Sequence, residues 1–362
     1  MPQTVVLLFG GRSSEHTISC ATAGGVLSAI DREKYHVIPV GITKDGAFTL
    51  QADDPAALRM DPANMPVVHD NGTRVQWPTS AVSREMTYTD AAGDTHSLGD
   101  VDVVFPILHG PFGEDGTIQG LLELLGLPYV GNGVLASSLG MDKHFTKTAL
   151  EAAGVTVAPW ITLTPRAWAE QRDLWYGRAV SLGLPLFVKP SRAGSSVGVT
   201  KVSSLDELDA ALATAWAEDS KALVESAVVG REVECGVLSG RDGAPTRVSL
   251  AGEIIMHGRD FYDFEAKYLD PDAAELVCPA DLREGELLEM QRIAARAFEA
   301  IGGYGLARID FFFTGEEFIV NELNTMPGFT PISMYPKCWQ ASGVSYPDLI
   351  DELIQLGLEA VR

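Results

Sequence analysis

The sequence predicts an α/β protein whose N-terminal part contains a mostly parallel sheet. Three observations predict this fold class. Short continuous apolar runs such as TVVLLFGG and VDVVFPILHG end in glycines, which is typical of strands buried on both faces. Segments with helical spacing of apolar residues alternate with these runs, as in a parallel sheet with crossover helices. The 362 residues, 46% of them hydrophobic, are enough for roughly two to three domains with buried cores.

The N-terminal third gives the clearest alternation of elements. We expect strands in TVVLLFGG, YHVIPVGIT, VDVVFPILHG and LPYVG. Helices are expected in SSEHTISCATAGGVLSAI, with Ser13 or Ser14 as its cap, and in TIQGLLELLG. Residues 52–100 are polar and carry the turn signals DNG and AAGDT, which predict loops and short strands. This order places ligand-facing loops at the C-terminal ends of the strands.

The rest of the chain predicts two further domains, with boundaries near Gly140 and residue 240, so that the domains span 1–140, 141–240 and 241–362. After the first boundary we expect a helix in MDKHFTKTALEAAG and strands in VTVAPWITL, LPLFVKP and GVTKV. A helix in LDELDAALATAWAED and a strand–turn–strand unit in KALVESAVVGREVECGVLSG follow. The last domain is expected to hold strands, the helix EGELLEMQRIAARAFEAIG, the strand pair LARIDFFF and EFIVNELNT, and a final helix after PGFTPISMYP.

Charge and cysteine usage exclude several classes of protein. The formal net charge is −22, which argues against nonspecific nucleic-acid binding because that rests on clustered lysine and arginine. The four cysteines are scattered singly, which favours free thiols in a reducing cytoplasm. No apolar run reaches the length of a membrane span, and the N-terminus lacks the basic segment of a signal peptide. We therefore expect a cytoplasmic protein that binds neither nucleic acid nor membrane.

The stretch VKPSRAGSSVGV contains phosphate-binding residue types in an unusual order. In a P-loop the glycines precede the lysine and lead into a helix, whereas here Lys189 comes first and the β-branched run GVTKV follows. The loop is therefore expected to join two strands, and backbone N–H groups between Gly194 and Gly198 would hold a phosphate without a helix dipole. An ordinary Gly/Ser hairpin explains this stretch equally well when it is considered alone.

The strand pair near the C-terminus favours the phosphate-binding interpretation. Arg308 and Asp310 are two residues apart and share one strand face, as do Glu322 and Asn324. The short turn TGE predicts a hairpin, which would gather Asp310, Glu322 and Asn324. These oxygen ligands suit Mg²⁺ or Mn²⁺ shared with phosphate oxygens. The alternative is a set of carboxylates on a solvated hairpin, but the neighbouring apolar residues favour burial.

Six motifs in order resemble the D-alanine–D-alanine ligase family of the ATP-grasp superfamily. They are FGGRSSEHTIS, LHGPFGEDGTIQG, KPSRAGSSVGV, YDFEAKY, ARIDFF and NELNTMPGFTPISMYP, and the resemblance covers essentially the whole chain. It implies an N-terminal αβ domain followed by a two-part ATP-grasp fold that grips ATP. It also implies ligation of two D-alanines through an acylphosphate, giving ADP and phosphate, for peptidoglycan precursor synthesis. Members of this family are usually homodimers, so a homodimer is expected.

The resemblance also assigns the nucleotide and metal residues. Two Mg²⁺ or Mn²⁺ ions are expected at Asp310, Glu322 and Asn324. Relatives often carry lysine directly after the glutamate that corresponds to Glu225, where this chain has Ser226. The residues expected to bind ATP are Lys143, Lys189, Ser196, Glu225, Val228, Glu232 and Phe261.

The same resemblance implies roles around the two D-alanines. Glu15 would bind the ammonium of the first D-alanine, although first-turn helix stabilisation also explains an acidic residue there. His109 lies near the first substrate in the family, and packing is an equally good explanation for a lone histidine. Arg308 and the Gly328 N–H would hold the oxyanion of the tetrahedral intermediate. The remaining implied contacts are Ser333 and the Met334 N–H to the second carboxylate, Lys267 to the γ-phosphate, and Tyr268 toward Ser195 and Glu15.

Three alternative functions differ from that of a D-alanine–D-alanine ligase in the sequence features that they would require. A dinucleotide-binding dehydrogenase would need G-x-G-x-x-G after the first strand, and FGGRSSEHT lacks it. Another ATP-grasp ligase, such as a D-alanine–D-lactate ligase, would differ at the position of Tyr268, where tyrosine goes with the dipeptide product. A protein that binds ATP without catalysis is the third alternative, and every expected catalytic position is filled here.

Overall fold

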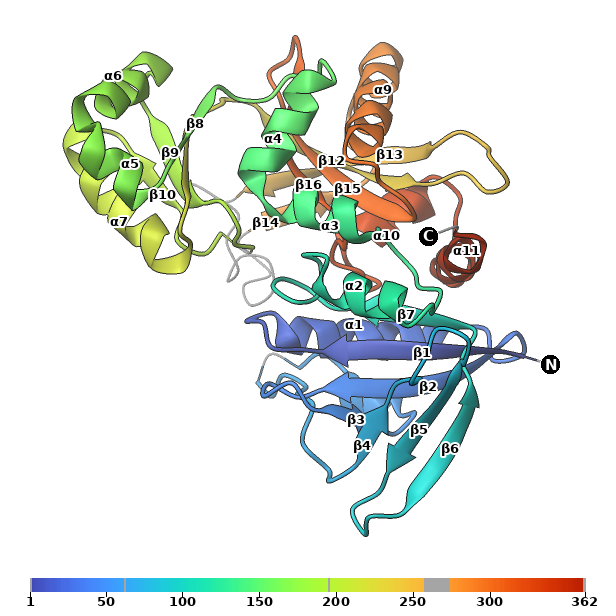
Figure 1. Cartoon of the computed structure of the whole chain (residues 1–362). Coiled ribbons are helices and arrows are strands. Elements are labelled where there is room, and N and C mark those ends of the chain that lie inside the picture. The colour runs from blue at the N-terminus through green and yellow to red at the C-terminus, as the bar shows by residue number, and fades with distance from the viewer. Residues whose placement is uncertain (1, 62, 195, 257–273, 361–362) are drawn as a thin grey trace.

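The computed structural model describes residues 2–61, 63–194, 196–256 and 274–360. The predicted site residues Ser195, Phe261, Lys267 and Tyr268 therefore lie outside the described residues. The described chain forms four sheets. One parallel-rich sheet with a small antiparallel sheet beside it lies at the bottom of Figure 1, and two antiparallel sheets lie above it. The α/β fold class predicted from the sequence is confirmed.

The N-terminal sheet is parallel except at one edge. Its central strand pairs in parallel with a neighbour on each side, and the edge strand β3 pairs antiparallel with β2. Continuous apolar runs form these strands because both faces are covered, so five of the eight residues of the central strand are at most 1% exposed. In spatial order the strands are β3 (Phe48–Leu50), β2 (Tyr35–Ile42), β1 (Gln3–Gly10) and β7 (Val103–Ile107).

Two predictions for this region were wrong in detail. The helix α1 (His16–Ala29) is preceded by Glu15 at its N-cap, and Ser13 accepts a hydrogen bond from the Glu15 N–H at 3.2 Å instead of capping the helix. LPYVG does not form a full fourth strand. It makes a single parallel bridge between Val104 and Tyr129, after which Gly131 turns the chain at φ +103°.

Residues 52–100 form loops and short strands, as expected. Three of the strands make a separate antiparallel sheet whose buried side chains, Val75 and Met86, pack with the N-terminal core. The elements here are η1 (Pro55–Leu58), β4 (Arg74–Gln76), β5 (Glu85–Thr89) and β6 (Thr95–Asp100).

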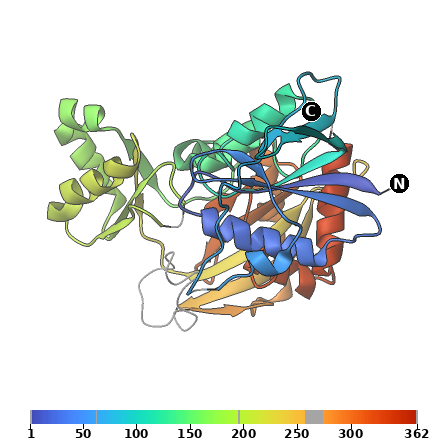
Figure 2. The same ribbon diagram turned by 90° about the horizontal axis from the view of Figure 1, so that it is seen from below.

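The second large unit projects to one side of the molecule, as the turned view in Figure 2 shows. Its sheet is antiparallel, in the order β10-β9-β11-β8, and helices cover one face. The predicted loop between LPLFVKP and GVTKV does join antiparallel neighbours, since Val188 pairs with Thr200. The elements are β8 (Trp160–Leu163), α5 (Pro165–Glu170), α6 (Arg172–Leu182), β9 (Leu186–Pro190), β10 (Thr200–Val202), η2 (Leu205–Glu207), α7 (Leu208–Glu218) and β11 (Ala222–Ser226).

The third unit contains a five-stranded antiparallel sheet in the order β14-β13-β12-β15-β16. The predicted hairpin is present, and Asp310 on β15 faces Glu322 on β16. The predicted final helix is two helices, α10 and α11. The elements are β12 (Arg231–Leu238), β13 (Arg247–Met256), β14 (Ala274–Val277), α9 (Glu284–Ala300), β15 (Leu306–Phe313), β16 (Phe318–Asn324), α10 (Met334–Ala341) and α11 (Tyr346–Glu359).

Three helices connect the N-terminal sheet to the later units, namely α2 (Thr117–Leu124), α3 (Val134–Met141) and α4 (Lys143–Ala152). Gly140, where the first boundary was predicted, lies inside α3, and a methyl group there would sit 2.7 Å from Thr325 Cγ2. The three-domain division stays a prediction. Because β12 pairs with β13 and β15, we propose that the second boundary lies before Arg231.

The C-terminal helix fixes the first and third units to each other. Leu353 and Ile354 of α11 belong to the same core as Val5 and Leu7 of β1. The Tyr35 hydroxyl also donates to an α11 carboxylate at 2.6 Å. None of the helices in the described ranges combines the length and the apolar character that a membrane span requires.

Candidate active site

A cavity of about 440 Å³ lies between the two antiparallel sheets. Its two walls differ in charge. The wall from β9 and β10 presents Lys189 and Lys201, while the wall from β12, β15 and β16 presents carboxylates. This arrangement suits a polyphosphate that is bound by lysine on one side and by cations on the other. Eight predicted site residues line the cavity: Lys143, Lys189, Ser196, Glu225, Val228, Glu232, Asp310 and Glu322.

Lys189 is held at a fixed position on β9 by a buried carboxylate. Its Nζ lies 2.5 Å from Glu225 Oε1, and Lys147 Nζ lies 3.1 Å from Glu225 Oε2. Burial raises the pKa of Glu225, but the two ammonium groups outweigh burial and hold the pKa below its ordinary value. Lys147 was not predicted, although it stands four residues after Lys143 and so shares a face of α4 with it. The pair of lysines keeps this wall positive.

Lys143 connects the Gly/Ser loop to the carboxylate wall. Its Nζ donates to the Ala193 carbonyl at 2.9 Å and lies 3.1 Å from Glu322 Oε1. It is the first residue of α4, whose N-cap Asp142 accepts a hydrogen bond from the Ser191 hydroxyl at 2.7 Å. The lysine is therefore placed by the helix start and the end of β9 together. A phosphate entering the cavity would meet Lys143 and Lys189 at the base of the loop.

The predicted metal ligands come together on the hairpin. Asp310 and Glu322 face each other, and Asn324 Nδ2 donates to Asp310 Oδ2 at 3.0 Å. Among the described residues no group of three or more His, Cys, Asp or Glu is arranged to hold a metal ion. Two carboxylates and one amide fit a cation whose other ligands are phosphate oxygens and water. Turning the Asn324 amide by half a turn would present Oδ1 to such a cation.

Arg308 lies in a buried network of carboxylates. Its Nε and a terminal nitrogen each donate to Asp310 at 2.7 Å, and Nε lies 3.1 Å from Glu234 Oε2. Burial lowers the pKa of Arg308, but the two carboxylates outweigh burial and raise the pKa well above its ordinary value. Glu234 was not predicted, although it follows Glu232 by two residues and therefore shares its strand face. The guanidinium group of Arg308 is therefore held in a fixed orientation beside the predicted metal ligands.

Glu15 lies where the N-terminal unit meets the Gly/Ser loop. A methyl group built on Gly110 would lie 3.1 Å from Glu15 Oε2, and one built on Gly194 would lie 3.3 Å from the same atom. His109 is buried beside this point. Its Nδ1 contacts the Met326 carbonyl at 3.1 Å, and its Nε2 has no hydrogen-bond partner among the described residues. Burial lowers the pKa of His109, so the neutral ring is favoured.

Glu114 is a half-buried residue whose carboxyl group the sequence interpretation missed. Its Oε1 accepts a hydrogen bond from the Gly110 N–H at 2.7 Å. Burial, followed by the charge of Glu15, raises its pKa to about 8. The acidic pair in GPFGEDG was a signal for a functional carboxylate, but its burial could not be inferred from the motif. Glu114 is therefore expected to be neutral at pH 7.

Glu114→Gln is expected to change how stability depends on pH. The folded-state pKa of about 8 exceeds the ordinary value of 4.5, so protonation stabilises the fold fully below about pH 4.5 and this effect is lost as the pH rises to about 8. Gln cannot ionise and can still accept from Gly110. The melting temperatures of wild type and variant should therefore agree near pH 5, and the variant should be the more stable above pH 8.

The exposed Glu33→Gln is the control, and its melting temperature should follow that of the wild type at every pH. Parallel pH profiles for wild type and Glu114→Gln would contradict a carboxyl group that stays neutral in the folded protein. Differential scanning fluorimetry between pH 5 and 9 measures the difference directly.

The residues predicted to bind the second D-alanine lie at the start of α10. Ser333 is the N-cap of α10, and its hydroxyl contacts the Thr330 hydroxyl at 2.7 Å instead of capping its own helix. Met334 begins the helix and is buried. Gly328 is half-buried and lies beside the fully buried Phe329. The backbone N–H groups at such a helix start favour an anion.

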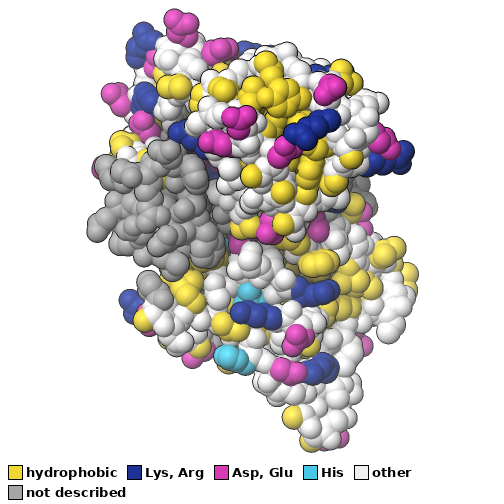
Figure 3. Space-filling model, turned by 90° about the vertical axis from the view of Figure 1, so that its left-hand side faces the viewer, with side chains coloured by type: hydrophobic (Ala, Val, Ile, Leu, Met, Phe, Trp, Pro, Cys, Tyr) yellow, Lys and Arg dark blue, Asp and Glu magenta, His cyan; other side chains and the backbone are white. Residues whose placement is uncertain are grey.

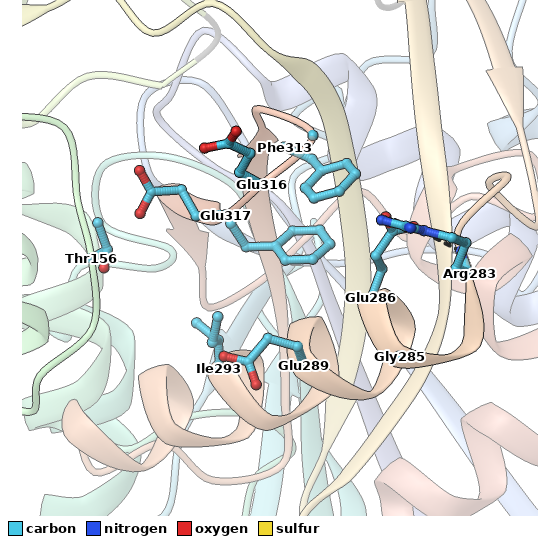
Figure 4. Close-up of a pocket in the computed structure, with 11 residues that line it drawn as sticks. Thr156, Arg283, Gly285, Glu286, Glu289, Ile293, Phe313, Glu316 and Glu317 are labelled. Atoms are coloured by element: carbon cyan, nitrogen blue, oxygen red, sulfur yellow. Dashed lines mark hydrogen bonds and ion pairs between the residues drawn. The ribbon is translucent and has the colours of Figure 1, made fainter.

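A second cavity, of about 560 Å³, lies between the start of α9 and the turn of the β15–β16 hairpin (Figure 4). Glu316, Glu317 and Glu289 surround it, and its one arginine, Arg283, is paired with Glu286. The acidic side chains around this cavity would repel the phosphates of a nucleotide. On the face shown in Figure 3, acidic and basic side chains are interspersed and no continuous basic patch appears among the coloured atoms.

Two parts of the chain match the descriptions of known protein families. Residues 4–132 match the family described as D-ala D-ala ligase N-terminus, and residues 149–355 match D-ala D-ala ligase C-terminus. A D-alanine–D-alanine ligase from Arthrobacter sp. (strain FB24) is 52% identical over 357 residues, covering 98% of this chain and 94% of the relative. One from Streptomyces coelicolor is 50% identical over 364 residues, covering 98% of this chain and 92% of the relative.

Two solved structures have the same fold. A D-Ala:D-Ser ligase from Enterococcus faecalis superimposes with a TM-score of 0.84 at 32% identity, covering 99% of this chain and all of that one. The D-alanine–D-alanine ligase from Coxiella burnetii gives a TM-score of 0.78 at 35% identity, covering 99% and 94%.

The two antiparallel sheets that enclose a lysine- and carboxylate-lined cavity define an ATP-grasp enzyme, of the class that joins a carboxylate to an amine and releases ADP. Within this class, the chain belongs to the D-alanine–D-alanine ligase family.

Proposed function

We propose that this enzyme joins two D-alanines to D-alanyl-D-alanine, with ATP converted to ADP and phosphate, for peptidoglycan precursor synthesis. The observation that carries this proposal is the cavity between the two sheets, in which Lys143 and Lys189 stand opposite Asp310 and Glu322. The family to which the chain belongs supports the choice of substrate.

ATP would lie in this cavity with its phosphates between the two walls. Lys189 and Lys143 would contact phosphate oxygens, and the segment around Val228, between β11 and β12, would contact the adenine edge. Two Mg²⁺ or Mn²⁺ ions, held by Asp310, Glu322 and Asn324, would neutralise charge on the phosphates. Glu232 and Ser196 line the same cavity and would contact the ribose and the phosphates.

The first D-alanine would bind where Glu15, Gly110 and His109 meet. Glu15 would receive the ammonium group, and the Nε2 of His109, which has no hydrogen-bond partner among the described residues, offers a polar contact. The substrate carboxylate then attacks the γ-phosphate to give an acylphosphate, and this step depends on positioning. Phosphate becomes the leaving group that a free carboxylate lacks.

The second D-alanine would bind at the start of α10. Its carboxylate would meet the Ser333 hydroxyl and the Met334 N–H, and its amine would attack the acyl carbon of the first substrate. The oxyanion of the tetrahedral intermediate would be held by Arg308 and the Gly328 N–H, because Arg308 is already oriented by Asp310 and Glu234. The proposed roles of Ser195, Phe261, Lys267 and Tyr268 concern residues outside the described ranges.

We also propose a homodimer in the cytoplasm. Cys20, Cys235, Cys278 and Cys338 are free thiols, as a reducing compartment favours. Light scattering of the purified protein would measure the mass directly, and a monomer at working concentration would contradict the dimer.

The test of the proposed function is ADP release with ATP, Mg²⁺ and single amino acids, with the product identified by mass. D-alanine alone should support ADP release and yield the dipeptide. D-serine and D-lactate are offered together with D-alanine, because one of the structural relatives is a D-Ala:D-Ser ligase. If the main product joins D-alanine to D-serine or D-lactate, the ligase chemistry stands, but D-alanine is not the preferred acceptor. No ADP with any acceptor would reject the ligase proposal.

A further inference from the structure

Two cysteines outside the nucleotide cavity lie side by side. Cys278 follows β14 directly and Cys338 lies within α10, and their Sγ atoms are 3.8 Å apart. They are 60 residues apart in the sequence. Each sulfur also lies near a backbone carbonyl, Cys278 near Ala251 at 3.7 Å and Cys338 near Glu234 at 3.9 Å. The pair therefore joins the edge of the five-stranded sheet to the helix that begins at the proposed acceptor site.

The environments of the two thiols differ in a way that suits stepwise oxidation. Cys338 is fully buried, in a small core with Ile254 and Met334, while Cys278 is half-buried at the edge of that core. The hydrogen bond with Cys338 is the main cause that lowers the pKa of Cys278, and the charge of Lys337 acts in the same direction. A partly exposed thiol with a lowered pKa meets an oxidant first, and a buried neighbour resolves it.

We propose that Cys278 and Cys338 are a modification site at which a peroxide forms a reversible disulfide that lowers the ligase activity. The formation of the disulfide does not depend on the proposed function, whereas its effect on activity does. Disulfides in reducing compartments are mostly transient and redox-sensing, which is the role proposed here.

The oxidation balances with one peroxide molecule. The Cys278 thiolate attacks one peroxide oxygen, the O–O bond breaks, and the leaving hydroxide takes a proton to become water. The resulting sulfenic acid is attacked by the Cys338 sulfur, the S–S bond forms, and the second oxygen leaves as water with the Cys338 proton. Two thiols are oxidised and hydrogen peroxide is reduced to two waters. A dithiol reductant reverses the step by thiol–disulfide exchange.

The disulfide between Cys278 and Cys338 would affect the proposed acceptor site through α10. A disulfide requires the sulfurs to approach from 3.8 Å to about 2.05 Å, so the side chains must turn or one of the segments must shift. Movement of α10 is opposed by tight packing against β13, because a methyl group on Gly252 would lie only 2.0 Å from Met334 Sδ. Strain would therefore appear at Met334 and the adjacent Ser333. Since displacement of about 1 Å at a reacting geometry can cost about 10²-fold in rate, we expect a loss of at least about tenfold in kcat/KM.

The experiment treats the full-length protein with hydrogen peroxide and follows two readouts. Mass spectrometry of the digested protein, without reduction, should show a peptide linking Cys278 to Cys338 with the loss of two hydrogen atoms. ADP release at subsaturating D-alanine should fall at least about tenfold and should recover with dithiothreitol.

Cys278→Ser is the matched variant, because its side chain is half-buried and the serine keeps its size. It should have normal activity before treatment and should keep it after the same treatment. Cys235→Ser, at another buried position, should still form the link. A missing linked peptide overturns the modification site, and a linked protein with unchanged ADP release overturns the effect on activity. If the untreated protein releases no ADP with D-alanine, the proposed function fails while the linked peptide still decides the site.

Discussion

Arg308→Lys is expected to lower kcat by about 10²–10³-fold with little change in the KM for ATP. Lysine keeps the positive charge between Asp310 and Glu234, so the buried carboxylates stay compensated and the fold should remain stable. What lysine cannot reproduce is the planar fork that donates from two nitrogens to Asp310 at 2.7 Å. The oxyanion develops only during the reaction, so the loss should appear in kcat.

Arg241→Lys is the matched control, because Arg241 makes a similar two-nitrogen contact, with Glu359, far from the cavity. Its kcat should equal that of the wild type. Steady-state ADP release, with the melting temperature as a check on folding, measures both variants. An Arg308→Lys enzyme with kcat within about threefold of wild type would show that charge alone is sufficient there.

The buried strands were predictable because each is an apolar run with a defined end. TVVLLFGG became β1, and both of its faces are covered. LPYVG has the same appearance but pairs at one position only, because strand pairing depends on where Gly131 directs the chain. The predicted cap at Ser13 or Ser14 failed for a related reason. Ser14 and Glu15 form a turn before α1 starts, and a sequence pattern does not fix the length of that turn.

The site was predictable where strand periodicity decides the outcome. Asp310, Glu322 and Asn324 come together because side chains alternate along paired strands, and the register matches the expectation. The ion pairs that compensate them were not predictable. Arg308 turning along its own strand to Asp310, and Lys143 reaching Glu322 from α4, depend on burial and on distant segments.

Glu114 shows the same limit at a single carboxyl group. The motif contains two adjacent acids, and only the fold shows that one of them accepts from the Gly110 N–H with a raised pKa. Electrostatics of this kind follow from contacts between units that are far apart in the sequence, so they cannot be inferred from local patterns.

Glu322→Gln is expected to lower kcat by about 10³-fold while the protein stays folded. Two carboxylates face each other across the hairpin, which is unfavourable unless cations lie near both. In the present arrangement Lys143 lies 3.1 Å from Glu322, and Arg308 compensates Asp310. When ATP binds, its phosphates would compete for Lys143, and divalent ions would have to replace it at Glu322. The substituted glutamine offers an amide oxygen without charge, so the phosphates would lose much of their neutralisation.

The control is Glu316→Gln, in the exposed turn of the same hairpin, which should leave kcat unchanged. ADP release over a range of Mg²⁺ concentrations, with D-alanine and ATP saturating, separates the two variants. Because the Glu322 side chain is about one-third exposed and its loss frees Lys143 to face solvent or phosphate, the melting temperature should change little. Full activity in Glu322→Gln would mean that this carboxylate is not required for turnover, and the divalent ions would then have to be assigned to other oxygen ligands.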